Sequence, residues 1–237
     1  SLRNYFTNLN MPFVPFEHQA KAYHRLSAAK PESTLVATGT GSGKTECFLY
    51  PLLNFCSSQK SQGNKAFVLF PMNALATDQA KRFAKTIASN DGLRSKVSVG
   101  LFVGQEDETP SKVMASDKVI TCKDTLRKSP PDILLTNYKM LDFLLMRPKD
   151  QKIWRFNEPD TLQYIVVDEL HTFDGAQGTD LSCLLRRLKY KLKTPEEHIA
   201  CVGTSATVGN DFSALTDYAS KIFDSEFEYS SVVTEDR

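Results

Sequence analysis

The segment Ala37–Glu46, with the sequence ATGTGSGKTE, is a glycine-rich stretch between a β-prone run, Thr34–Ala37, and a run with apolar residues at helical spacing, Cys47–Phe55. A strand, a tight turn and a helix in this order are typical of an α/β domain. Backbone N–H groups of such a turn, together with the start of the helix, can bind phosphate oxygens. Lys44 adds a positive charge for the outer phosphates, and Thr45 adds a hydroxyl for Mg²⁺.

We therefore expect this segment to bind a nucleoside triphosphate. The strict phosphate-loop pattern, G-x-x-x-x-G-K-[ST], begins with a glycine where this chain has Thr38, although most of the expected N–H groups come from the residues after it. On this segment alone, a kinase, a nucleotide-dependent switch and a motor protein all remain open. The residues predicted to bind the nucleotide are Thr40, Gly41, Ser42, Gly43, Lys44, Thr45 and Glu46.

The composition is that of a globular protein with little net charge. The chain has 237 residues, 41% of them hydrophobic, which suffices for a core and favours one α/β domain. Its 29 Lys and Arg residues balance 28 Asp and Glu residues, so charge neither supports nor excludes a nucleic-acid partner. The cysteines form no Cys-x-x-Cys pair and no apolar run is long enough for a membrane span, so we expect a cytoplasmic protein without a membrane partner. The chain begins at Ser1, and we expect a fragment of a longer protein.

Short β-prone runs alternate with segments that can be helical, which predicts a mainly parallel sheet covered by helices. Tyr164–Asp168 is apolar until its last residue, as expected for a central strand that is buried on both faces. We expect helices at 123–128, Asp180–Lys193 and Ala214–Phe223, a surface excursion over 105–131, and a polar end after the last helix. The predicted strands are Thr34–Ala37, Ala66–Pro71, Val97–Val103, Asp132–Thr136, Tyr164–Asp168 and His198–Gly203.

A second chemical motif, Asp168-Glu169-Leu170-His171, directly follows the apolar strand. The carboxyl ends of strands are where open α/β sheets bind ligands. There Asp168 can hold Mg²⁺ through water, and Glu169 can orient and deprotonate the water that attacks the γ-phosphate. The predicted catalytic residues are Glu169, Asp168 and Lys44, and the predicted metal ligands are Thr45 and Asp168.

A third element, Gly203–Thr207, carries hydroxyl groups at 204, 205 and 207 after another short apolar run. We interpret it as a loop, because Ser and Thr are common in turns. Its hydroxyls can hydrogen-bond the region of His171 and relay the state of the phosphate to another surface. The predicted coupling residues are therefore His171, Ser205 and Thr207.

The order of these three motifs resembles the first RecA-like domain of superfamily 2 helicases, the DEAD/DEAH-box group with a DExH box. The resemblance implies a three-layer RecA-like fold with a mainly parallel central sheet. Phe16-Glu17-His18-Gln19 lies where this family often has a glutamine that reads adenine, so Gln19 is expected to bind the base; the less favoured alternative is a polar residue that opens a helix running to Leu26. Segments 71–75 and 136–141 resemble motifs Ia and Ib, which hold one strand of nucleic acid; the contacts implied here are Asn73, Thr136 and Asn137.

The residues after the Asp-Glu-Leu-His box look closest to RecQ-related and Lhr-like helicases, a branch that includes bacterial helicases of phage-defence systems. The resemblance implies ATP and Mg²⁺ as cofactors, nucleic acid as partner with DNA favoured over RNA, and defence-complex proteins as further partners. It also implies that residues 1–237 form one N-terminal domain, whose ATP site is completed by arginines of a second RecA-like domain that the chain lacks. We therefore expect weak ATP binding, very slow hydrolysis and no unwinding by this domain alone.

Two other interpretations are weighed against a helicase motor. An ATP-switched nucleic-acid scaffold in a defence complex would hydrolyse ATP without displacing strands. A small-molecule kinase would need no Asp-Glu-x-His box followed by Ser-Ala-Thr, and this order of motifs disfavours it.

Overall fold

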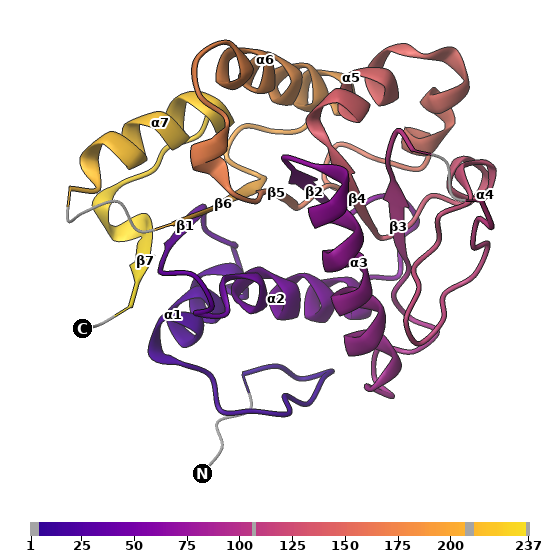
Figure 1. Ribbon diagram of the computed structural model, residues 1–237, viewed down its shortest axis with the longest axis horizontal. Helices are drawn as coiled ribbons and strands as arrows, with labels where there is room; N and C mark the ends of the chain where they lie inside the picture. Colours follow the sequence, from indigo (N-terminus) through magenta and orange to yellow (C-terminus); the bar gives the residue numbers. More distant parts are fainter. Residues whose placement is uncertain (1–4, 106–107, 207–210, 236–237) are drawn as a thin grey trace.

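A single parallel sheet forms the centre of the protein (Figure 1). The computed structural model describes residues 5–105, 108–206 and 211–235. Seven strands pair in the order β3-β4-β2-β5-β6-β1-β7, and every pair of neighbours is parallel. The strands are β1 (Thr34–Ala37), β2 (Ala66–Phe70), β3 (Val99–Phe102), β4 (Ile133–Asn137), β5 (Tyr164–Val167), β6 (Ala200–Ser205) and β7 (Val232–Thr234).

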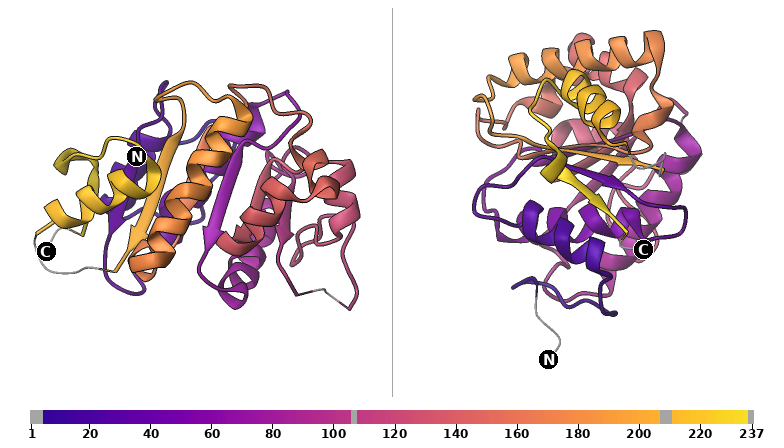
Figure 2. Two further views of the ribbon diagram at one scale, coloured as in Figure 1. Left: turned by 90° about the horizontal axis from the view of Figure 1, so that it is seen from above. Right: turned by 90° about the vertical axis from the view of Figure 1, so that its left-hand side faces the viewer.

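Helices cover both faces of this sheet, which confirms the predicted three-layer α/β fold (Figure 2). One face packs against α1 (Glu17–Leu26), α2 (Lys44–Ser58) and α3 (Asn73–Ala88). The other packs against α4 (Lys123–Lys128), α5 (Tyr138–Met146), α6 (Gly175–Leu192) and α7 (Ser213–Phe223). Short 3-10 helices are η1 (Pro148–Trp154), η2 (Leu170–Thr172) and η3 (Tyr229–Ser231). Among the described residues, no helix combines the length and the apolar character needed to cross a bilayer.

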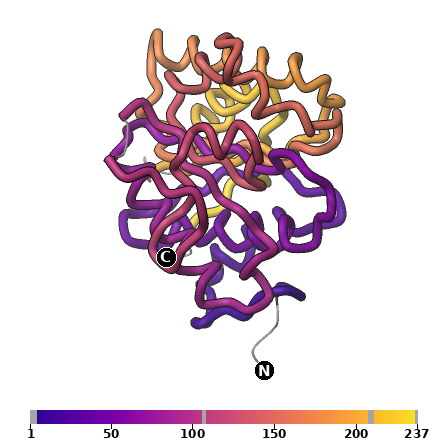
Figure 3. The backbone as a smooth tube through the Cα atoms, turned by 90° about the vertical axis from the view of Figure 1, so that its right-hand side faces the viewer, coloured from indigo at the N-terminus to yellow at the C-terminus, as the bar shows by residue number. Residues whose placement is uncertain are grey.

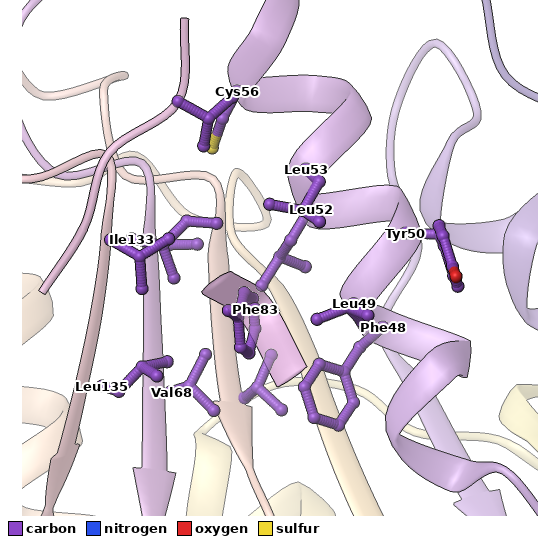
Figure 4. Packing of buried hydrophobic residues seen from close by; sticks show 14 of the residues in the cluster. Phe48, Leu49, Tyr50, Leu52, Leu53, Cys56, Val68, Phe83, Ile133 and Leu135 are labelled. Carbon is purple, nitrogen blue, oxygen red and sulfur yellow. The ribbon is translucent and has the colours of Figure 1, made fainter. Parts of the chain in front are cut away.

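The hydrophobic core is divided by the sheet into two layers. In the layer beneath α2, Phe48 and Leu52 point at the sheet beside Phe83 of α3 and Val68 of β2 (Figure 4). These four side chains are fully buried. Burial of each such side chain contributes about 1.5–3 kcal/mol relative to exposure, so the helix behind the glycine-rich turn is held firmly against the sheet.

All six predicted strands are present, with ends that shift by up to two residues. Two parts of the prediction were wrong. β6 continues through Ser205, so the first hydroxyl residues after the apolar run belong to a strand rather than a loop. The polar end contains β7, which pairs with β1. Its three residues follow two serines and precede Glu235, and so short a run did not predict a strand.

The excursion between β3 and α4 returns to the sheet instead of lying apart from it. Ile120 forms a parallel bridge with Gly100, its carbonyl accepts a hydrogen bond from Leu101 N at 2.9 Å, and its own N–H donates to Val99 O at 3.0 Å. Figure 3 views the molecule from the side on which this segment lies. The short predicted helix follows as α4, with the predicted bounds. The excursion therefore covers the outer edge of β3.

Candidate nucleotide-binding and hydrolysis site

Three central strands bring the three motifs to one edge of the sheet. β6 lies between β1 and β5, with Ala37 opposite Ser205 and Val167 opposite Gly203. The glycine-rich loop after β1 and the acidic motif after β5 therefore flank the hydroxyl residues at the end of β6. Motifs that are more than 120 residues apart in the sequence meet where parallel sheets bind ligands.

The glycine-rich loop has the conformation that its glycines permit. Gly41 and Gly43 have φ angles of 79° and 76°, values that glycine adopts without the penalty other residues meet. Gly43 directly precedes α2, so the N–H groups of the first turn of this helix point toward the loop. Lys44 Nζ donates a hydrogen bond to the carbonyl of Thr38 at 3.2 Å, which places the ammonium group across the loop. Thr45 is buried in the same first turn.

Thr38, which stands in place of the first glycine of the strict phosphate-loop pattern, stabilises the loop by hydrogen bonds on its buried side. Its hydroxyl lies 2.5 Å from that of Ser42, and the Ser42 hydroxyl donates to the carbonyl of Gly39 at 2.7 Å. Thr38 is 1% exposed, so its extra side-chain atoms occupy the interior and leave the phosphate side of the loop to the backbone. The pattern alone gave no indication of this role.

Helix α1 holds the loop from the side. The His18 ring nitrogen Nε2 is 2.8 Å from the carbonyl of Ser42, and the Gln19 amide donates to the carbonyl of Gly43 at 3.2 Å. The Gln19 side-chain oxygen accepts from Phe16 N at 2.9 Å, at the start of the helix. Gln19 is buried with both ends of its amide engaged inside the protein, and its contact with adenine stays a prediction. His18 was not predicted, although it belongs to the same Phe16–Gln19 motif.

The side chains of Phe16 and Glu46 border this part of the loop. The Phe16 ring is 63% exposed and stacks on the His18 ring, with centroids 5.6 Å apart and planes 10° apart. The Glu46 carboxylate faces α3, where Oε1 accepts from Arg82 Nη1 at 3.3 Å. The other carboxylate oxygen, Oε2, lies beside Gly43 and is buried without a hydrogen-bond partner among the described residues, so the Glu46 side chain borders the loop as well as tying α2 to α3.

One buried threonine organises the acidic motif. The Thr204 hydroxyl donates to Asp168 Oδ1 and accepts from Glu169 N, the second bond being 3.1 Å long. Glu169 has a φ of 52°, a left-handed conformation that a residue other than glycine adopts only when its surroundings hold it there. Thr204, which follows the end of the predicted strand, thus holds both acidic residues in place. From the sequence, only its hydroxyl group had been noted.

The Asp168 carboxyl is 5% exposed, and burial raises its pKa above the usual value. The hydrogen bond from Thr204 opposes this rise, the negative charge of Glu169 adds to it, and the positive charge of Lys44 lowers the pKa again. Lys44 and Asp168 are thus close enough to interact electrostatically, as two groups on either side of a bound phosphate would be.

The predicted coupling residues form a chain of polar contacts across β5 and β6. His171 Nε2 lies 3.3 Å from Glu169 Oε2, and its Nδ1 lies 3.2 Å from the Ser205 hydroxyl. The expected contact between the hydroxyl segment and His171 is confirmed for Ser205. Thr207, the third predicted coupling residue, lies outside the described residues.

The residues implied for nucleic-acid contact occupy the same edge of the sheet, at the ends of β2 and β4. Asn137 Nδ2 donates to Asn73 Oδ1 at 2.6 Å, and Asn137 Oδ1 accepts from Met140 N at 2.9 Å as the cap of α5. These contacts join the first turns of α3 and α5. Thr136 is fully buried and its hydroxyl donates to the carbonyl of Phe102, so its side chain ties β4 to β3. Its contact with nucleic acid stays a prediction, which the buried position of its side chain does not support.

The donor set at this edge suits a nucleotide and its magnesium ion. The described part of the chain contains no group of three or more His, Cys, Asp or Glu side chains arranged to hold a metal ion. Mg²⁺ in nucleotide sites is commonly bound by one or two protein oxygens together with phosphate oxygens and water. Asp168, Thr45 and the N–H groups around Gly43 fit this mode of binding, in which the metal ion arrives with the nucleotide.

Comparison with known proteins agrees with this geometry. The profile of the DEAD/DEAH box helicase family matches residues 16–215. Druantia protein DruE of Escherichia coli (strain UMEA 4076-1) is 25% identical over 292 residues, an alignment that covers 83% of this chain and 16% of DruE. The Lhr helicase/uracil glycosylase of Escherichia coli (strain K12) is 29% identical over 208 residues, which cover 82% of this chain and 12% of Lhr.

A solved structure has the same fold. The crystal structure of the DUF1998 helicase MrfA bound to DNA and AMPPNP matches with a TM-score of 0.67 and 26% identity, over 93% of this chain and 27% of MrfA. This chain thus spans less than a third of the length of each of these relatives. The resemblance to Lhr-like helicases is confirmed, as is the RecA-like fold. The chain belongs to the DEAD/DEAH box helicase family.

Proposed function

We propose that residues 1–237 form the N-terminal RecA-like domain of an ATP-dependent helicase or translocase that acts on nucleic acid. The polar chain from Glu169 through His171 to Ser205 carries this proposal. It joins the residue placed to activate water to the strand beside the glycine-rich loop. A protein that only stored a nucleotide would not need such a path from the phosphate to a neighbouring strand.

In this proposal each polar group at the edge has one task. The loop N–H groups and Lys44 bind the phosphates, while Thr45 and Asp168 hold Mg²⁺. When bound, Mg²⁺ neutralises charge on the phosphate oxygens. Glu169 accepts a proton from the attacking water and is positioned by Thr204 and His171.

The nucleic acid is proposed to cross the first turns of α3 and α5, where Asn73 and Asn137 lie together. The N-terminus of a helix offers N–H groups and a positive dipole end to phosphate oxygens. DNA is favoured over RNA because MrfA, which matches over most of this chain, was crystallised with DNA. A second RecA-like domain would supply arginines to the ATP site, so this domain alone is expected to turn over ATP very slowly.

The substitution Glu169→Gln in the full-length protein tests the proposal. The variant should bind ATP as the wild type does and lose turnover by about 10²–10⁴-fold, because the amide cannot accept the proton. Glu158→Gln is the matched control, since Glu158 is exposed in the turn before β5, at the opposite end of the strand. Turnover that survives in Glu169→Gln would assign the base to another residue.

The biological setting is a separate proposal. Similarity to DruE and MrfA supports a role in a bacterial defence system with a helicase motor. The alternative, an ATP-switched scaffold, is not favoured, because the relatives matched over most of this chain include named helicases. Plaque counts on cells with the wild-type or the Glu169→Gln protein test the defence role, and strand displacement by the intact protein separates a motor from a switch.

A further inference from the structure

A long groove of about 1030 Å³ begins beside Asn73 and runs to the outer edge of the sheet. One wall is the first part of α3, with Asn73, Thr77 and Lys81. The opposite wall, which we call the basic wall, consists of Lys123, Asp124 and Arg127 of α4 together with Arg147 and Lys149. Figure 1 shows α3 and α4 on the two sides of β3. The predicted contact Asn73 is thus one end of a larger concave surface.

A fully buried carboxylate positions the two arginines of the basic wall. Asp150 is 0% exposed; its Oδ1 accepts from Arg127 Nε at 2.8 Å and its Oδ2 accepts from Arg147 Nε at 2.6 Å. Each guanidinium has five donors, and Asp150 takes one from each. Two guanidinium groups that share one buried anion are held in place before any ligand arrives and keep N–H donors that Asp150 does not use.

The charges of the basic wall are unequal. It carries four cationic side chains and one surface carboxylate, Asp124, which pairs with Arg127 at 2.9 Å. The remaining lining is mixed, since it includes the acidic residues Asp78, Glu108 and Asp117 as well as Lys81 and Lys118. The excess of positive charge in the groove is thus concentrated in the basic wall. The phosphodiester backbone of a nucleic acid is negatively charged and therefore complementary to the basic wall. An acidic protein surface would be complementary too, but it would not explain why the groove also includes Asn73, the predicted nucleic-acid contact.

We propose that the groove binds the phosphodiester backbone of the single strand beyond Asn73, with Arg147, Arg127 and Lys149 contacting successive phosphates. This inference rests on the proposed nucleic-acid function and extends its site toward the edge of the sheet. The residues of α3 line one side of the bound strand, and the cationic side chains of the basic wall neutralise its phosphate charges. Guanidinium groups suit this task because their planar donors match phosphate oxygens.

The variants Arg147→Gln and Lys149→Gln in the full-length protein test the groove. Arg147→Gln leaves the Arg127–Asp150 pair in place, and Lys149 is an exposed side chain with no such structural duty. Lys191→Gln on the exposed face of α6 is the control for loss of one positive charge. Thermal unfolding identifies any variant that does not fold, and Lys149→Gln then carries the test.

Binding of fluorescent oligothymidines of about 6 and about 20 nucleotides is measured against salt concentration. For the long strand each variant should weaken binding by about 3–10-fold at low salt and reduce the salt slope by about 0.7, the value for one phosphate contact of a single strand. The short strand and the control variant should change by less than about twofold. Unchanged binding of the long strand would refute the groove and leave the proposed function intact. An equal loss for both strands would also refute it, and no binding by the wild type would overturn both.

Discussion

Replacing Thr204 with valine should separate the chemical role of this residue from its packing. Valine has nearly the same shape, so the substitution removes the hydroxyl and little else. Two hydrogen bonds are lost in the buried edge of the sheet, one to the Asp168 carboxylate and one from Glu169 N. Thr204 is fully buried, so water cannot replace either bond without rearrangement.

The expected loss of stability follows from the two bonds. A hydrogen bond to a charged group contributes about 2 kcal/mol, and a buried N–H without an acceptor costs about 1 kcal/mol or more. We therefore expect the free energy of unfolding to fall by about 3 kcal/mol at neutral pH. Thr136→Val is the matched control, because Thr136 is equally buried but donates only to the neutral carbonyl of Phe102. It should lose about 1 kcal/mol.

The pH dependence distinguishes the two variants. Burial raises the pKa of Asp168 in the folded state above its usual value of 3.8, so the folded protein holds this proton at a pH where the unfolded chain has lost it. The raised pKa destabilises the folded state fully at a pH above the pKa of folded Asp168, and not at all at a pH below the usual value of 3.8. Without the Thr204 hydroxyl the pKa of Asp168 rises further, and the penalty at neutral pH grows.

Urea unfolding of both variants, from about pH 7 down to the lowest pH at which the wild type stays folded, measures this effect. The deficit of Thr204→Val should shrink by about 2 kcal/mol as Asp168 becomes protonated. The deficit of Thr136→Val should not depend on pH. A deficit of Thr204→Val that stays constant with pH would show that the hydroxyl does not support a charged Asp168.

Two further substitutions test other parts of the structure. Gly43→Ala should cost about 1–2 kcal/mol for its positive φ and also weaken ATP binding, because the new methyl group would lie 2.4 Å from the Gln19 amide nitrogen. Gly41→Ala has the same strain with no atom within 4 Å, so equal ATP affinities in a titration of both variants would exclude a role for the Gln19 contact. Asp150→Asn should lower the free energy of unfolding by about 3 kcal/mol or more, since two arginines lose their buried anion. A loss below about 1 kcal/mol on chemical denaturation would show that these arginines do not depend on the charge.

Much of the fold followed from the sequence because its signals are local. The apolar run before Asp168 marked β5, and the glycines before Lys44 marked the turn between β1 and α2. The order of three motifs, each after a strand, then placed them at one edge, because parallel strands share their carboxyl ends. The adjacency of Ser205 and His171 is a consequence of strand order, because β6 lies beside β5. The contact was predicted from the hydroxyl groups of the segment, without that order.

The remaining features depend on contacts between distant segments. Thr38 and Thr204 each bond to groups whose positions only the folded loop and sheet define. Thr136 matched a family motif, but its register in β4 turns the hydroxyl toward β3. Asp150 lies in an ordinary polar stretch of sequence, and nothing there indicates that two arginines will surround it. Tertiary structure decided each of these roles.

The position of β1 in the sheet has a consequence for how the protein is made. Its two neighbours are β6 and β7, which are synthesised after the other strands of the sheet, whereas β2, β4 and β5 can pair among themselves earlier. During translation the strand that bears the glycine-rich loop must wait for residues 200–205 before it finds a partner, and such distant pairing is slow. The nucleotide loop, although it follows the first strand of the sheet in the sequence, becomes a binding site only when β6 and β7 have been synthesised. A ribosome that stalls before β6 therefore leaves a chain with a half-formed sheet and no means of binding ATP.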